Sequence, residues 1–141
     1  MDLENIAEIK ASSDYGTPII LVYMQYFQRS ENYDKLIKKI DNIIKKTLDL
    51  SNKKYNLDKF SVSIDLLNTS IIQVDYTLAQ SLIKKFYNDY PKKLHKLEII
   101  NMNIVLKGVY KIIEPFLRES TKNRIILKDK EITISSDSDE N

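Results

Sequence analysis

Hydrophobic and polar positions follow two different periods along the chain. Residues 33–50 repeat apolar side chains every three to four positions with lysines between them, which predicts an amphipathic helix. Residues 59–67 alternate apolar and polar side chains with a period of two, which predicts a strand with one buried face. Residues 74–91 return to the helical period until Pro91, which ends the predicted helix.

Three further segments favour strands. Residues 17–27 follow the turn signal DYGTP and are rich in β-branched and aromatic side chains. Residues 96–101 and 123–128 are shorter apolar runs, separated by a third helical pattern. The predicted order is therefore β-α-β-α-β-α-β. Strands separated by helices favour parallel pairing, so the expected fold class is α/β, with a single, mostly parallel β-sheet and helices packed on it.

The third predicted helix, at about residues 103–117, is apolar over most of its circumference. One apolar stripe consists of Leu106, Tyr110, Ile113 and Leu117, and an adjoining stripe consists of Val105, Val109, Ile112 and Phe116. Two apolar stripes require two apolar partners. One partner could be the sheet or a neighbouring helix and the other a ligand, although spacing alone favours packing against protein.

The same helix has two weak points. Gly108 lowers helix stability by up to ~1 kcal/mol relative to alanine. Pro115 either kinks the helix or opens a new short helix at its first turn. We therefore expect Gly108 and Pro115 to act as hinges.

The composition excludes several kinds of chemistry. The 141 residues fit one domain and include no cysteine, so disulfides, thiolate nucleophiles and cysteine-bound metals are excluded. With only two glycines, neither a phosphate-binding loop nor a dinucleotide fingerprint can be formed. His95 is the only histidine and is expected in a solvated loop, while Asp65 at the end of a strand is a better turn residue than a magnesium ligand. We expect no enzyme activity, no catalytic residue, no metal and no cofactor.

Charge is distributed unevenly. Residues 129–141 hold five acids and one lysine, which leaves 21 basic and 15 acidic residues in the rest of the chain. A basic body favours anionic surfaces, either lipid headgroups or nucleic acid, unless the lysines only solvate helix faces. The tyrosines do not form a basic, aromatic-interleaved run, so we expect no nucleic-acid partner. The acidic tail is expected to be disordered. The richness in lysine, isoleucine, asparagine and tyrosine suggests an AT-rich genome, such as that of a large DNA virus or a protist.

No secretory signal is visible at the N-terminus, and the longest apolar run, PIILVYMQYF, is about half the ~20 residues that a membrane-spanning helix needs. We therefore expect a soluble, cytoplasmic protein.

Two stretches of the sequence resemble a known family. YPKKLHKLEIINMN (90–103), followed by VYKIIEPFLRESTKNRIIL (109–127), is similar to the CRAL-TRIO lipid-binding domain, in which a YPERL…IIN stretch leads through a gate helix into KPFL. Earlier, GTPIILV (16–22) and SIDLLN (63–68) resemble the family's GRPV and DLKG strands. The resemblance spans about residues 14–128.

The resemblance implies a domain at 13–128, preceded by an N-terminal extension (1–12) and followed by the acidic tail (129–141). We expect a minimal version, without the family's N-terminal helical domain and C-terminal closing segment. Lys92 stands where relatives that bind phosphatidylinositol carry an acid, so inositol recognition is not implied.

The resemblance also implies a hydrophobic pocket that is floored by the sheet, closed by the mobile gate helix and filled by one lipid. The expected pocket residues are Phe60, Val62 and Ile64 on the floor and Leu106, Val109, Tyr110, Ile113 and Leu117 on the gate helix. Lys107 and Lys111 are expected to face an anionic membrane during transient association. The alternative is a protein-interaction domain of the same fold with a collapsed cavity. A large cavity beneath residues 104–117 would favour lipid binding, and side chains filling that space would favour the alternative.

Overall fold

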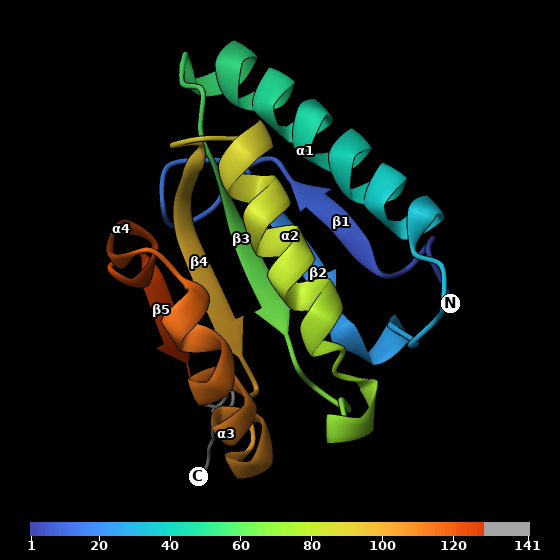
Figure 1. Cartoon of the computed structure of the whole chain (residues 1–141). Coiled ribbons are helices and arrows are strands. Elements are labelled where there is room, and N and C mark those ends of the chain that lie inside the picture. The colour runs from blue at the N-terminus through green and yellow to red at the C-terminus, as the bar shows by residue number, and fades with distance from the viewer. Residues whose placement is uncertain (129–141) are drawn as a thin grey trace, which may run out of the picture.

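Five strands within residues 1–128 form one sheet. The computed structural model describes residues 1–128, so the predicted disordered tail at 129–141 lies outside the described residues (Figure 1). The strands are adjacent in chain order: β1 (Ala7–Lys10), β2 (Ile19–Tyr23), β3 (Phe60–Asp65), β4 (Leu94–Ile100) and β5 (Ile125–Lys128). Strands β2 to β5 are parallel, and β1 pairs antiparallel with β2. The predicted fold class, a single and mostly parallel sheet with helices, is confirmed.

Three long helices lie over one face of this sheet (Figure 1). The α-helices are α1 (Asp34–Tyr55), α2 (Tyr76–Asp89), α3 (Ile104–Ile113) and the short α4 (Glu119–Lys122). Three 3₁₀ turns connect elements: η1 (Met24–Tyr26), η2 (Ile71–Gln73) and η3 (Glu114–Phe116). Because each crossover helix follows a parallel strand, η2 and the start of α3 both lie at the carboxyl ends of the central strands.

The longest helix, α1, packs its apolar stripe on the sheet. Leu36 and Ile44 are buried there, and Ile44 belongs to the same core cluster as Ile20 of β2 and Phe60 of β3. The helix ends at Asn56, whose φ of 56° places it in the left-handed region that commonly terminates helices.

Strand β1 was not predicted. No element is predicted within residues 1–12, but Ala7 pairs with Val22, and Lys10 pairs with Ile19. The strand has only four residues, and its charged side chains Glu8 and Lys10 alternate with apolar ones. A pattern this short is difficult to distinguish from an irregular extension.

Two other predictions about strands were wrong in detail. The strand predicted at 17–27 ends at Tyr23 and continues as η1. His95 lies within β4 rather than in a solvated loop, and burial lowers the pKa of its imidazole.

The predicted helix at 103–117 is divided at Pro115. Helix α3 ends at Ile113, and η3 begins with Pro115 in its first turn, so Pro115 opens a new short helix instead of kinking a continuous one. The start of α3 is capped by Asn103, whose side-chain oxygen accepts a hydrogen bond of 2.9 Å from the backbone N–H of Leu106.

On the sheet face away from the helices, the carboxylate of Glu98 lies at the centre of a polar cluster. Glu98 accepts hydrogen bonds from the hydroxyls of Tyr15 (2.6 Å) and Ser63 (2.8 Å) and lies 2.6 Å from the ammonium of Lys128. Burial tends to raise the pKa of Glu98, but these donors together hold it below its usual value. The cluster links β3, β4, β5 and the loop before β2.

Asp65 serves as a turn residue. Its carboxylate accepts hydrogen bonds from the backbone N–H of Leu67 (2.9 Å) and from the side-chain amide of Asn101 (2.8 Å), which ties the loops after β3 and β4 together. Among residues 1–128, no group of three or more histidine, cysteine, aspartate or glutamate side chains could hold a metal ion. Within the same range, no helix combines the length and the apolar character needed to cross a bilayer.

Candidate functional site

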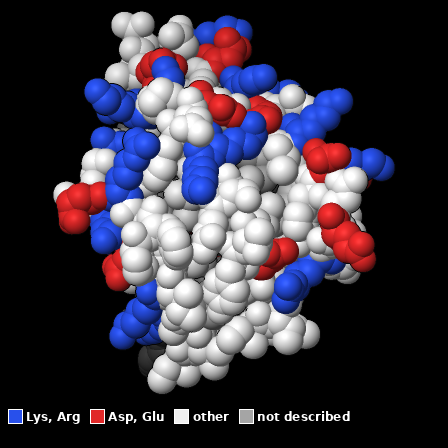
Figure 2. Space-filling model, in the orientation of Figure 1, with Lys and Arg blue, Asp and Glu red and all other residues white. Residues whose placement is uncertain are grey.

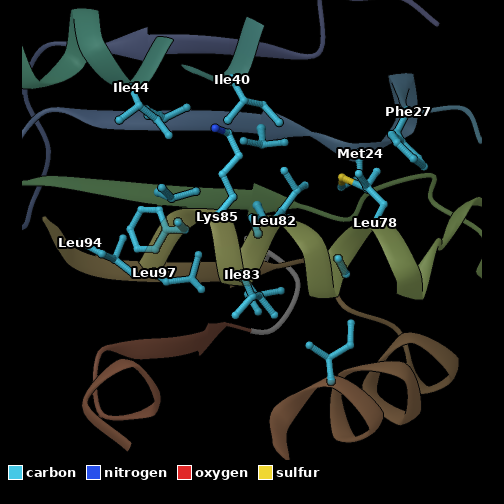
Figure 3. Close-up of a pocket in the computed structure, with 18 of the residues that line it drawn as sticks. Met24, Phe27, Ile40, Ile44, Leu78, Leu82, Ile83, Lys85, Leu94 and Leu97 are labelled. Carbon is cyan, nitrogen blue, oxygen red and sulfur yellow. The ribbon is translucent and has the colours of Figure 1, made fainter. Parts of the chain in front are cut away.

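A large apolar cavity lies between the sheet and the helices. Its volume is about 480 Å³, and its walls come from β2, β3, β4 and β5 below and from α1, α2 and α3 above. Figure 3 shows Ile40 and Ile44 of α1 on one side and Leu78 and Leu82 of α2 on another, with the strands beneath. The period-two alternation explains the floor, because every second strand residue points towards the helices.

This volume is far larger than an ordinary packing defect. Protein interiors pack about as densely as organic crystals, and few internal voids exceed the size of a water molecule. Apolar cavities of about 150 Å³ already bind small apolar molecules. A cavity of about 480 Å³ falls within the range of about 300–1,000 Å³ that is typical of ligand pockets.

Seven of the eight predicted pocket residues line this single cavity. Phe60, Val62 and Ile64 of β3 form part of the floor. On the opposite wall are Leu106, Tyr110, Ile113 and Leu117. The side chain of Val109 lies outside those that the structure describes.

The predicted hinge and basic residues do not line the cavity. Gly108 and Pro115 are exposed, as are Lys107 and Lys111 on the outer side of α3. A Cβ atom added at Gly108 would meet no atom within 4 Å, so this glycine is not required for close packing.

Sequence reasoning missed the contribution of α1 and α2 to the cavity. Their lining residues include Leu36, Ile40, Ile44, Leu78, Leu82 and Phe86. All of them belong to the apolar stripes that predicted the two helices. The same stripe is expected for a helix that packs directly on a sheet, so the sequence pattern contained no signal for the cavity.

A polar bridge connects α1 and α2 at the cavity wall. The Lys85 ammonium lies 3.3 Å from Asp41 and 2.6 Å from Asp89, and the Tyr90 hydroxyl donates a hydrogen bond of 3.0 Å to Asp41. Burial and this hydrogen bond raise the pKa of Tyr90 to about 12.

The segment formed by α3 and η3 is held mainly on its cavity side. Leu106 is only 3% exposed and packs in a cluster with Ile99 of β4 and Met102. Beyond η3, the Tyr87 hydroxyl of α2 accepts a hydrogen bond of 3.0 Å from the backbone N–H of Arg118 and donates one of 2.8 Å to Thr121. These contacts fix the two ends of the segment.

The second apolar stripe of α3 is uncovered by residues 1–128. Val105, Ile112 and Phe116 are each more than half exposed, so one of the two partners expected for this helix is missing in the described structure. Helix α3 contacts η2, and both η2 and the loop before it carry further exposed apolar side chains. We call this set the end patch: Leu67, Ile71, Ile72, Ile104, Val105, Ile112 and Phe116.

The end patch lies in a region with few charges. Figure 2 shows charged side chains concentrated on the upper part and the margins of this face, while the lower part, where α3 and η2 lie in Figure 1, is mostly uncharged. Ile72 is 76% exposed and Ile104 is 84% exposed. Exposed apolar patches rimmed by polar residues commonly mark surfaces that contact a membrane or another protein.

Comparison with known proteins places these features in context. No curated protein sequence matches the chain. Among solved structures, the crystal structure of Sfh5 superimposes with a TM-score of 0.62 at 16% sequence identity, over 89% of this chain and 49% of that chain. This chain therefore spans about half of the Sfh5 chain, and the likeness is one of fold.

The sequence itself matches the CRAL/TRIO domain over residues 9–140, which is most of its length. This family comprises lipid-binding and lipid-transfer domains. A parallel sheet that floors an apolar cavity beneath α3 agrees with the match. The chain thus belongs to the CRAL/TRIO domain family.

Proposed function

We propose that this chain binds one lipid molecule in the cavity beneath α3 and carries it between membranes. The observation that supports this function most directly is the apolar cavity of about 480 Å³ in a member of a lipid-binding family. The chemistry is reversible burial of apolar surface, so no covalent step is required.

The cavity favours lipid binding over the alternative of a protein-interaction domain with a collapsed cavity. In a collapsed version, side chains of the gate helix and the sheet would fill the space between them. Leu106 and Tyr110 from α3 and Val62 from β3 instead line a continuous volume.

The cost of opening explains why exchange should occur at a membrane. Release of a lipid requires the α3–η3 segment to move and uncover about four large apolar side chains: Leu106, Tyr110, Ile113 and Leu117. Exposing them to water costs roughly 6–12 kcal/mol, at about 1.5–3 kcal/mol each. At a bilayer these side chains can remain in an apolar environment, so the open state is stabilised only there.

The end patch provides the means of membrane contact. Its side chains are already exposed, so their insertion into the headgroup region gains free energy without unfolding any element. Lys107 and Lys111 lie on the same helix and are exposed. Each would gain on the order of 1 kcal/mol near anionic headgroups.

The first test is mass spectrometry of an organic extract of the purified chain, alongside an identically handled control protein. We expect one lipid class at close to one molecule per chain. The absence of any lipid, even after incubation with mixed vesicles, would contradict the proposal.

A substitution inside the cavity gives the second test. We expect Tyr110→Arg to abolish lipid retention with the fold intact, because the substitution brings a charge into an apolar cavity. The control is Leu57→Arg, at an exposed position outside the cavity. Equal lipid content in both variants, at equal circular dichroism, would count against a cavity-bound lipid.

A further inference from the structure

The apolar side chains of the end patch have no covering partner within residues 1–128. Ile104, Val105, Ile112 and Phe116 belong to the α3–η3 segment, and all four are more than half exposed. Single exposed apolar side chains are common on protein surfaces, whereas a group of this kind is not. Covering the group removes apolar surface from water, which is favourable. A segment that can reach the end patch would therefore be stabilised on it.

The described residues end beside this patch. Strand β5 finishes at Lys128, which pairs with Ile100 of β4, and Ile104 at the start of α3 follows Ile100 by only four residues (Figure 1). The strand pairing and the short connection limit the distance between the Cα atoms of Lys128 and Ile104 to about 20 Å. An extended chain covers about 3.3–3.6 Å per residue, so residues 129–134 alone can cross that distance.

Residues 129–141 contain a short apolar stretch within an acidic composition. Ile132 and Ile134 are separated by Thr133, so both isoleucines would point to the same side of an extended chain and the threonine to the other. Two large apolar side chains on one side suit a contact with the exposed apolar side chains of α3. The segment that can reach the end patch thus also has the chemistry to cover it.

The charge of the same segment is complementary to that of α3. Helix α3 carries two exposed lysines, Lys107 and Lys111, and no acid, while the following η3 adds only Glu114. Residues 129–141 carry five acids and one lysine, and three of the acids follow the isoleucines. Opposite charges closer than a Debye length of about 8 Å attract each other at physiological salt, which would reinforce an apolar contact.

We propose that residues 129–141 fold back over the end patch, with Ile132 and Ile134 on the apolar side chains of α3 and the following acids beside Lys107 and Lys111. The segment then shields the patch in water and competes with a membrane for the same surface. The competition rests on the proposed function, whereas the contact between the segment and α3 does not. Anionic headgroups attract the lysines and repel the acids, so an anionic bilayer favours displacement of the segment.

The contact can be measured in the full chain, because the sequence contains no cysteine and a single thiol can be introduced. A spin label on Ser136→Cys broadens the amide NMR signals of residues close to it. We expect broadening in α3 and none around Leu57, which lies between α1 and β3.

Two substitutions distinguish a defined contact from a tether that only keeps the segment nearby. Ile132→Asp and Thr133→Asp add the same charge at adjacent positions, but only the first removes an apolar side chain from the proposed contact. We expect Ile132→Asp to lower the paramagnetic relaxation rates of α3 about two- to fivefold and Thr133→Asp to leave them unchanged.

Sedimentation with anionic vesicles tests the competition in the same two variants. Ile132→Asp should bind vesicles about two- to fivefold more tightly than Thr133→Asp, because it uncovers the end patch at equal net charge. Equal vesicle binding, with the contact present in the NMR experiment, would overturn the competition. If neither variant nor the wild-type chain binds vesicles, the membrane contact of the proposed function fails while the contact of the segment with α3 stands.

The NMR experiment decides the contact itself. Equal relaxation rates in the two variants, or α3 signals that the label leaves unchanged, would overturn it whatever the vesicles show. Broadening of an isotope-labelled chain by a separate, spin-labelled chain would also overturn it, because the end patch would then be covered by a second copy.

Discussion

Glu98 shows how one residue can stabilise the sheet from the face opposite the cavity. Its neighbours Leu97 and Ile99 point into the cavity, so Glu98 points away, towards Tyr15, Ser63 and Lys128. The side chain of Glu98 is only 12% exposed, so its carboxylate depends on these donors instead of water. The contacts keep strand β5, the outermost strand next to α3, attached to the centre of the sheet.

We predict that Glu98→Gln lowers the free energy of unfolding at neutral pH by roughly 1–2 kcal/mol, because hydrogen bonds to a charged group are stronger than those to a neutral one. The pKa of Glu98 is lower in the folded chain than the ordinary 4.5, so its contribution is present above pH 4.5 and is lost as the pH falls through the folded pKa. The difference between wild type and variant should therefore shrink on acidification.

Urea denaturation at neutral pH and well below pH 4.5 measures both effects. Glu31→Gln, at an exposed position, is the control and should change little at either pH. A destabilisation by Glu98→Gln that is independent of pH would contradict the assigned role of the carboxylate.

Individual residues of the candidate site could be predicted where the position of a residue in a strand or helix repeat determines which way its side chain points. Phe60, Val62 and Ile64 alternate in β3, and Leu106, Tyr110 and Ile113 recur along α3, so both sets face the interior. The bridge between Asp41 and Lys85 joins residues 44 positions apart, and nothing in the local sequence links them.

At the scale of one element, the α3–η3 segment combines a capped start with a glycine that lowers the stability of the middle of the helix. Asn103 caps the start, Gly108 lies in the middle, and Pro115 begins the next turn. Because Gly108 is exposed and unobstructed, its effect on the helix is purely conformational.

We predict that Gly108→Ala stabilises α3 by about 0.5–1 kcal/mol and slows exchange of a fluorescent lipid between vesicles by roughly two- to fivefold. Asn103→Ala removes the cap and should have the opposite effect, with faster exchange. Transfer rates measured for both variants test the role of the helix. If both variants match the wild type, α3 moves as a rigid body and Gly108 is not a hinge.

At this scale the sequence predicted the long helices and the apolar strands and missed two short elements of mixed polarity. Helices α1 and α2 repeat their apolar stripe over several turns, which makes the period unmistakable. Strand β1 and helix α4 have four residues each, too few to establish a period. The exposure of one stripe of α3 was also unpredictable, because a helical wheel shows that a face is apolar but does not show what covers it.

For the molecule as a whole, the two ends of the sheet differ. The end patch begins where β3 and β4 finish, whereas the exposed Leu57 lies between α1 and β3, at the other end of β3. Leu106 of α3 lines the cavity, whereas Ile104 and Val105 of the same helix are exposed. The proposed membrane contact and the proposed gate are therefore parts of the same element.

We predict that Ile72→Asp and Ile104→Asp each weaken binding to anionic vesicles roughly tenfold, because each replaces a large exposed apolar side chain by a charge that is costly to insert. Leu57→Asp makes the same kind of change at the other end and should have little effect. Sedimentation with vesicles provides the measurement. Vesicle binding that falls equally in all three variants would indicate general loss of hydrophobicity rather than a defined contact surface.

The proposed lipid would also contribute to the stability of the fold. A lipid in the cavity would cover apolar side chains that otherwise face empty space or water, and this burial would stabilise the folded chain. A ligand that binds only the folded state stabilises it by mass action. Chains without cargo are therefore expected to unfold and be degraded first, so turnover would select for loaded molecules and link the abundance of the protein to the supply of its lipid.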